Sequence, residues 1–229
     1  MIVYGRNPVR EALRGPRRVE RVWVTAPASR EPWLQSPQAA VSTVAADEVE
    51  RICGSGSHQG LCAQVEPFRY ASEEAVLAGS QPLIVALDQV QDPQNLGSIC
   101  RTAECAGASA VVIPERRAVE VTAAVCKASA GAVEHLPVAR VRNLADFLRE
   151  AKAAGAWCYG AAAGAPTPFD GVDLSGPVVL VLGAEGKGLR PRVAAACDDL
   201  LSLPMRGRTE SLNVSAAAAV LLYAAAGGR

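Results

Sequence analysis

The sequence predicts an α/β protein with two domains, of which the larger C-terminal one is built on a mostly parallel sheet. From Pro82 onward, short apolar runs rich in β-branched residues alternate with helix-like segments of roughly 8 to 14 residues. This alternation is typical of parallel strands joined by helices that cover both faces of a sheet. Residues 1–70 show shorter and less regular elements, which favour a separate small domain.

Residues 1–70 carry signals for two helices and three strands. Helices are predicted at Pro8–Arg14 and Asp47–Cys53, and strands at Val19–Thr25, Val41–Val44 and Leu61–Val65. The Pro-rich stretch from Pro27 to Pro37 predicts a loop. These elements are too few and too short for a large sheet, so they indicate a small appended α/β domain.

Residues 71–81 are predicted to link this domain to a second one that spans 82–229. A short helical stretch, Ser72–Ala78, leads into the loop-forming residues Gly-Ser-Gln-Pro at 79–82. The expected strands that follow read LIVAL, AVVI, LPVAR, WCYGAA, VVLVL and LLSLP. Because ligands of such sheets bind at the carboxyl ends of strands, the loops after Leu87, Leu182 and Pro204 are the candidate sites.

Composition places the chain among globular proteins and excludes several functional classes. Half of the 229 residues are apolar, and 23 basic residues balance 23 acidic ones, so no global charge attracts nucleic acid or membrane. The seven cysteines are scattered and form neither a disulfide framework nor a zinc pattern, and no metal is expected. The N-terminus lacks the apolar core of a signal peptide, and the run Val214–Ala226 is too short to span a bilayer. We expect a cytoplasmic protein.

The first candidate loop leads into a helix that carries Asn95, Gly97 and Arg101. Asp92-Pro93 predicts a turn, Asn95 is a natural N-cap, and Arg101 follows about two helical turns later. From the residues alone, Asn95 could simply cap the helix and Arg101 could pair with Glu104.

The second loop, LVLGAEGKGL, leaves a buried strand and contains glycines at 183, 186 and 188. It matches neither the dinucleotide-binding glycine pattern nor the phosphate-cradling loop. This argues against a nicotinamide-dependent dehydrogenase and a nucleotide hydrolase. The glycines could also serve only to turn the chain.

The third loop, LPMRGRTESLNVS, precedes a helix of small residues. Ser211 is a natural N-cap, and a helix N-terminus offers free N–H groups to a polar ligand. Capping alone explains Ser211 but gives no reason for Asn213 within the first turn.

Together the three loops resemble, in order and position, the signature motifs of the SpoU (TrmH-like) family of RNA 2′-O-ribose methyltransferases. The motifs are N-x-G-x-x-x-R from Asn95 to Arg101, G-A-E-G-x-G at 183–188, and S-L-N-V-S at 211–215. Residues 1–70 resemble the family's L30e-like substrate-binding domain through GRNPVREAL at 5–13 and His58-Gln-Gly. The resemblance implies a trefoil knot through the last two motifs and a homodimer formed by the C-terminal domain.

The resemblance also implies the roles of individual residues. It assigns Arg101, Asn95, Glu185, Ser211 and Asn213 to the reacting centre, and Gly183, Leu203 and Leu212 to S-adenosylmethionine. Because an arginine is effectively always protonated, we favour for Arg101 a role on a target phosphate and on the charge growing at the 2′-oxygen over that of a base. Glu185 could either order Arg101 or contact the substrate.

Basic residues near the N-terminus are the candidate RNA contacts. Arg6, Arg10 and Arg14 recur every four residues and can share one helix face, which could also be a merely solvated face. His58 is expected to be either an RNA contact or a structural turn residue. His135 precedes a strand and is expected to be structural.

The function implied is methylation of a guanosine in 23S-type ribosomal RNA, as in RlmB-like members of the family. Ribosomal RNA is favoured because transfer-RNA members generally lack the L30e-like domain. The alternatives are a transfer-RNA guanosine 2′-O-methyltransferase and a non-catalytic RNA-binding protein of ribosome assembly.

Overall fold

The computed structural model describes residues 1–34 and 39–227, and every element below lies within these ranges. The N-terminal domain is a four-stranded mixed sheet in the order β1-β4-β2-β3, in which only β2 and β3 run parallel. Its elements are β1 Ile2–Tyr4, α1 Arg6–Arg14, β2 Val19–Val24, η1 Ala28–Arg30, η2 Pro32–Leu34, β3 Ala40–Thr43, α2 Ala46–Cys53 and β4 Leu61–Val65.

The predicted helices and strands of this domain are confirmed to within two residues, but the first strand was missed. β1 has only three residues, too few to show alternation, and it forms a strand because it pairs with β4 at the edge of the sheet. The predicted loop from Pro27 is interrupted by the short helices η1 and η2, and its end at 35–37 lies outside the described residues.

The C-terminal domain is a seven-stranded sheet in the order β7-β6-β5-β10-β8-β11-β9, with all neighbouring strands parallel. Its elements are α3 Glu73–Leu77, β5 Leu83–Asp88, α4 Pro93–Cys105, β6 Ala110–Pro114, α5 Ala123–Ala128, η3 Ala132–Glu134, β7 Val138–Val141, α6 Leu144–Ala153, β8 Trp157–Ala161, β9 Thr167–Pro168, η4 Phe169–Gly171, β10 Val178–Gly183, α7 Pro191–Ala194, β11 Asp199–Ser202 and α8 Val214–Gly227. The predicted fold class is therefore confirmed, while the trefoil knot stays a prediction.

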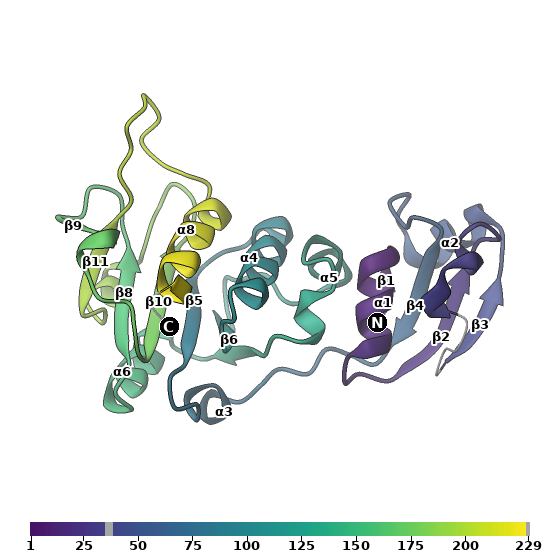
Figure 1. The fold of residues 1–229 in the computed structure, drawn as a ribbon, viewed down its shortest axis with the longest axis horizontal. Coiled ribbons are helices and arrows are strands. Elements are labelled where there is room, and N and C mark those ends of the chain that lie inside the picture. Colours follow the sequence, from purple (N-terminus) through teal and green to yellow (C-terminus); the bar gives the residue numbers. More distant parts are fainter. Residues whose placement is uncertain (35–38, 228–229) are drawn as a thin grey trace.

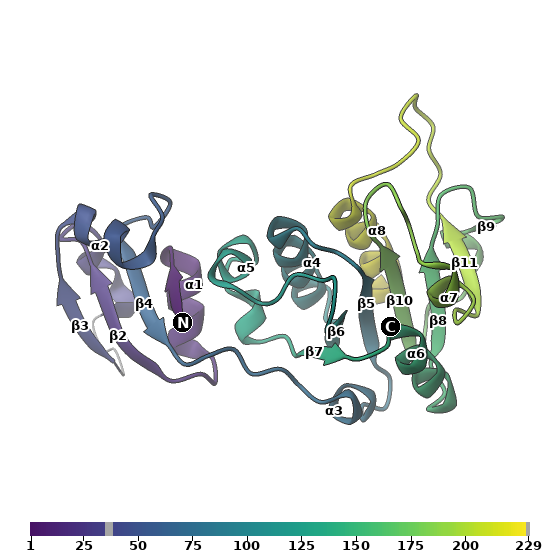
Figure 2. The ribbon, with the colours of Figure 1, turned by 180° about the vertical axis from the view of Figure 1, so that it is seen from behind.

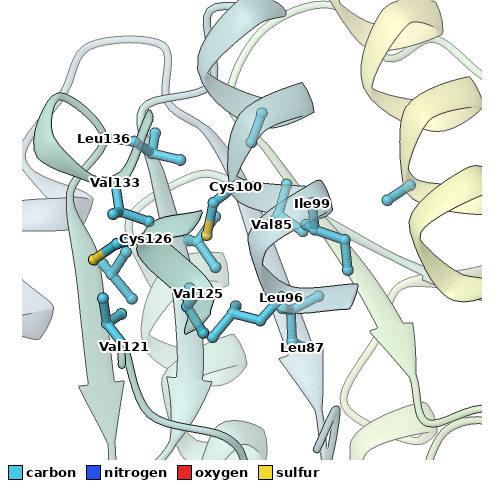
Figure 3. Close-up of a cluster of buried hydrophobic side chains, with 14 of the residues drawn as sticks. Val85, Leu87, Leu96, Ile99, Cys100, Val121, Val125, Cys126, Val133 and Leu136 are labelled. Carbon is cyan, nitrogen blue, oxygen red and sulfur yellow. The ribbon is translucent and has the colours of Figure 1, made fainter. Parts of the chain in front are cut away.

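Helices cover both faces of this sheet, as Figures 1 and 2 show from opposite sides. Alternate residues of β5 enter two separate cores: Val85 packs under α4, α5 and α8, and Ile84 packs with Phe147 of α6 on the other face. Figure 3 shows the first core, where side chains of β5, α4 and α5 meet, among them Leu96 and Val125. Burying both faces explains why these strands read as continuous apolar runs.

Buried thiols contribute to these cores. All seven cysteines are free, and Cys100 and Cys126 lie inside the cluster of Figure 3. Burial raises the pKa of the Cys100 thiol to about 12, so this side chain behaves as a small apolar group. No helix within residues 1–34 and 39–227 is both long enough and apolar enough to cross a membrane.

The predicted linker at 71–81 is packed against the C-terminal domain over part of its length. Ala71 forms a parallel bridge with Ala139 of β7, and Val76 of α3 is buried in the second core. Just before it, the Tyr70 hydroxyl accepts a hydrogen bond from the Val121 backbone N–H at 2.9 Å. This segment holds the two domains close together, and the boundaries at 70 and 82 stay predictions.

The two domains meet where α1 and β1 lie beside α5 and η3 (Figures 1 and 2). A buried ion pair crosses this junction: Arg17 donates from Nε to Oε2 of Glu134 at 2.8 Å, and from Nη2 to Oε1 of the same carboxylate. The Arg17 side chain is 4% exposed and that of Glu134 is 1% exposed. Because neither charge can be hydrated, each depends on the other domain for its partner.

We predict that Arg17→Met lowers the free energy of unfolding by roughly 3–5 kcal/mol, because the Glu134 carboxylate is left buried without its partner. Arg69→Met is the matched control: Arg69 also pairs with a glutamate, Glu66, but its side chain is 76% exposed. It should cost less than about 1 kcal/mol. Urea unfolding followed by circular dichroism measures both, and equal losses in the two variants would contradict the assigned role of the buried pair.

Candidate active site

The three candidate loops meet at the carboxyl edge of the parallel sheet. Asn95 lies in the first turn of α4, which follows β5, and Glu185 lies in the loop after the neighbouring strand β10. Asn213 immediately precedes α8. Residues that are far apart in the sequence thus arrive at one place because parallel strands end on the same side.

Hydrogen bonds join these three side chains directly. Nδ2 of Asn213 donates to Oδ1 of Asn95 at 3.0 Å and to Oε1 of Glu185 at 2.5 Å. Nδ2 of Asn95 donates to the same Glu185 oxygen at 3.0 Å. Each amide uses its donor and its acceptor at once, so the three loops hold one another in a fixed arrangement.

The helix caps differ from the predicted ones by a few residues. Asp92, not Asn95, caps α4, because its Oδ1 accepts from the Gln94 N–H at 2.9 Å. Asn213, not Ser211, takes the capping position before α8, where its Oδ1 accepts from the Ser215 N–H at 2.8 Å. Asn95 therefore does not cap the helix, and its side-chain amide hydrogen-bonds with Glu185 and Asn213 instead.

A cavity of about 260 Å³ opens beside this network. Asn95 and Glu185 line it together with Gln89, Asp92 and Lys187. Amides, carboxylates and an ammonium group can hydrogen-bond the hydroxyls of a sugar or the oxygens of a phosphate. The cavity therefore offers hydrogen-bond partners to a polar ligand, and Val90, Ala184 and Val214 complete its lining with apolar surface.

The glycine-rich loop after β10 is folded tightly over its own strand. A Cβ atom on Gly183 would lie 2.1 Å from the carbonyl carbon of Gly188, so only glycine fits at 183. The Gly188 N–H donates to the Ala184 carbonyl at 2.9 Å and closes the turn. This turn fixes the position of Glu185 at the edge of the cavity.

Sequence reasoning missed a second connection between the loops after β5 and β10. Asp88, the last residue of β5, is buried and accepts from Arg190 twice, from its backbone N at 2.8 Å and from Nε at 2.7 Å. A buried carboxylate needs a cation or several donors, and Arg190 supplies both. The available signal was an aspartate that ends an otherwise apolar strand.

Arg101 lies on the exposed side of α4. Its side chain forms no hydrogen bond or ion pair with Glu104 or with any other residue in the described part of the chain, so the alternative of a simple helix ion pair is not realised. The motif glycine nearby has a packing reason: a Cβ atom on Gly97 would lie 2.4 Å from Cβ of Ala128, where α4 crosses α5. Arg101 keeps its guanidinium available for a ligand.

The segment between β11 and α8 extends away from the body of the domain (Figures 1 and 2). Leu203 at its start is half-buried, whereas Ser211 and Leu212 are exposed. Within the described residues, Ser211 has no side-chain hydrogen bond, so the structure brings Asn95, Glu185 and Asn213 into contact but leaves Arg101 and Ser211 outside the network.

The candidate RNA-binding residues of the N-terminal domain are largely engaged in ion pairs. Arg6 lies 2.9 Å from Glu31, and Arg10 and Arg14 both reach Oε1 of Glu11. All three pairs are partly open to solvent, so the arginines can still approach phosphates.

The two histidines have structural partners. His58 is only 9% exposed, and its Nδ1 accepts from the Gly60 N–H at 2.9 Å, which favours a turn residue over an RNA contact. His135 lies with Nε2 3.0 Å from Oε2 of Glu11, across the domain junction.

Two family models together match nearly the whole chain. The SpoU rRNA Methylase family matches residues 82–223, which contain all three candidate loops. A model described as RNA 2′-O ribose methyltransferase substrate binding matches residues 2–71.

Individual relatives and solved structures are also similar to this chain over nearly its whole length. The TrmH family protein YacO of Bacillus subtilis is 41% identical over 232 residues, which are 96% of this chain and 93% of that protein. An uncharacterized tRNA/rRNA methyltransferase of Synechocystis is 39% identical across 97% of this chain, which spans 61% of that protein's length. The structure of an AdoMet-bound rRNA methyltransferase from Sinorhizobium meliloti matches with a TM-score of 0.83 and 28% identity, over 98% of this chain and 85% of that one.

Proposed function

The chain belongs to the SpoU rRNA methylase family, and on this basis we propose that it is an S-adenosylmethionine-dependent RNA 2′-O-ribose methyltransferase acting on a guanosine of 23S-type ribosomal RNA. The observation that carries the proposal is the network of Asn95, Glu185 and Asn213, which joins the three motif loops around one polar cavity.

The residues present fit the proposed cofactor. The tight turn that begins at Gly183 leaves space beside Gly186 and Gly188, where a Cβ atom would meet nothing within 4 Å, so backbone groups there are open to a flat adenosine group. Leu203 and Leu212 offer apolar contacts on the third loop. When bound, S-adenosylmethionine supplies an already activated methyl group. The protein's contribution is therefore alignment and help for a weakly acidic hydroxyl.

Arg101 is assigned to the substrate. Its guanidinium is always protonated and has no ion-pair partner among residues 1–34 and 39–227, so it binds the target phosphate and stabilises the negative charge that grows on the 2′-oxygen. Glu185 has no contact with Arg101 and is held by two amides at the cavity, which favours contact with the substrate over ordering Arg101. Ser211 and Asn213 complete the reacting centre from the third loop.

The two domains divide the work in this proposal. Residues 82–229 form the catalytic domain, and residues 71–81 link it to the N-terminal domain. Residues 1–70 bind RNA, with Arg6, Arg10 and Arg14 as phosphate contacts. Ribosomal RNA is favoured over transfer RNA because the substrate-binding domain is present. A transfer-RNA guanosine methyltransferase and a non-catalytic assembly protein are the competing functions, and labelled methyl transfer to purified ribosomal and transfer RNA separates all three.

A homodimer is part of the proposal. Helix α8 contains no charged residue, yet Ala216, Val220 and Tyr223 form an exposed stripe along it, and Leu212 just before it is 45% exposed. An exposed apolar stripe of this kind on a helix is typical of a surface that packs against another protein surface. A second copy of the chain would cover it and would bring two candidate sites close to the interface.

Arg101→Ala should lower methyl transfer to ribosomal RNA by at least about a hundredfold, because the charge on the 2′-oxygen loses its stabiliser. Affinity for S-adenosylhomocysteine, measured by calorimetry, should stay within a few-fold of wild type. Glu104→Ala, an exposed ionic residue on the same helix, is the control and should retain activity. Loss of cofactor binding in folded Arg101→Ala protein would contradict the assignment to the substrate.

The dimer is tested by light scattering at micromolar concentration, where the wild type should have twice the mass of one chain. Val220→Asp combined with Tyr223→Asp should give monomers, because two carboxylates would have to be buried unpaired in the interface. Val41→Asp changes an exposed valine of the N-terminal sheet and should leave the dimer intact. A monomeric wild type would refute the proposal.

A further inference from the structure

A second, much larger groove of about 1040 Å³ lies at the same edge of the sheet, on the face that α6 and α7 cover. Five arginines line it. Arg116 and Arg117 follow β6, Arg142 follows β7, and Arg190 and Arg192 flank the start of α7. None of these residues belongs to the three motifs, and the groove lies in the C-terminal domain rather than in the substrate-binding domain.

Four of the five arginines are available to a ligand. Arg190 is bound to Asp88, whereas the other four form no ion pair with any residue of ranges 1–34 and 39–227. All of them are exposed. Because no carboxylate pairs with these four side chains in the described part of the chain, the protein itself does not neutralise their positive charge.

The turn that presents two of these arginines is held in a fixed conformation. Arg117 adopts a positive φ of 60°, which a non-glycine residue takes up at some energetic cost. Nε2 of Gln91 donates to the Arg117 carbonyl at 3.4 Å, and the Val119 N–H donates to the Val90 carbonyl at 3.1 Å. The turn is thereby tied to the loop after β5, which leads to Asn95.

The lining of the groove also contains acidic residues. These are Glu73, Asp146 and Glu150, and burial together with the nearby Glu150 raises the pKa of the Glu73 carboxyl. Carboxylates repel phosphates, so a polyanion would contact the arginines and avoid these three residues. No aromatic side chain is among the residues lining the groove, so base stacking is not offered and contacts would be made with the backbone of a nucleic acid.

The groove leads to the candidate active site. Gln89 lines both the groove and the cavity that contains Asn95 and Glu185. We propose that the groove holds the phosphate backbone of single-stranded RNA next to the target nucleotide and guides that nucleotide into the cavity. This inference rests on the proposed function, and it adds an RNA-binding surface in the C-terminal domain.

The test compares the full-length wild type with Arg116→Gln combined with Arg142→Gln, which leaves the Asp88–Arg190 pair intact. Binding of a fluorescein-labelled 12-nucleotide polyuridine RNA is followed by anisotropy at several salt concentrations. The double variant should bind about tenfold more weakly at low salt. The negative slope of log affinity against log salt should become shallower by about 0.7 for each arginine lost, about 1.4 in all.

Arg51→Gln combined with Arg69→Gln removes the same charge from exposed, ion-paired positions that are not among the assigned phosphate contacts of the N-terminal domain, and this variant should bind the oligonucleotide as the wild type does. Both double variants should keep their affinity for S-adenosylhomocysteine, which shows that they are folded. The proposal would be overturned if the groove variant bound the oligonucleotide with the affinity and salt slope of the wild type. It would also be overturned if the wild type did not bind the oligonucleotide. Displacement of the RNA by equimolar pyrophosphate would also overturn it, in favour of a small-anion site. Methyl transfer to ribosomal RNA, assayed separately, shows whether the proposed function stands.

Discussion

The parallel sheet of the C-terminal domain is the constraint on which the candidate site depends. Because every strand runs in the same direction, the loops after β5 and β10 must leave from one edge, and α8 returns to that edge. Two sets of polar contacts then hold the loops together: the network of Asn95, Glu185 and Asn213, and the buried contact of Asp88 with Arg190. The loops are thereby positioned before any ligand binds, which is what alignment of a methyl donor and a hydroxyl requires.

A second constraint is the buried pair of Arg17 and Glu134 at the domain junction. A pair of this kind stabilises little by itself, but removing one partner leaves the other charge buried and unpaired, which is costly. The N-terminal domain is for this reason held in a defined position relative to the sheet. Its arginines and the arginine-lined groove, both proposed as phosphate contacts, are consequently held in defined positions relative to the motif loops.

The sequence predicts most of this fold because the buried strands are long apolar runs and the helices between them are amphipathic. β1 and β9 were not predicted, because strands of two or three residues form only by pairing with a neighbouring strand and are too short to show a sequence pattern. The N-caps shift to Asp92 and Asn213 because several residues suited to capping stand within three positions of each other. For the pair of Asp88 and Arg190, separated by 102 residues, the sequence offers only an aspartate that ends an apolar strand and no indication of its partner. The assignment of Arg101 depends on the family resemblance, because an exposed unpaired arginine is common on any surface.

The central claim is that the methyl group goes to the ribose and not to the base. It is tested most directly with a substrate RNA that carries a single 2′-deoxy substitution at the mapped target guanosine. Phosphates and RNA shape supply most of the affinity, so this RNA should bind nearly as well as the unmodified one and inhibit its methylation competitively. With labelled S-adenosylmethionine it should accept no methyl group, because it lacks the nucleophile. Methyl incorporation at the guanine base of the deoxy RNA would contradict the account.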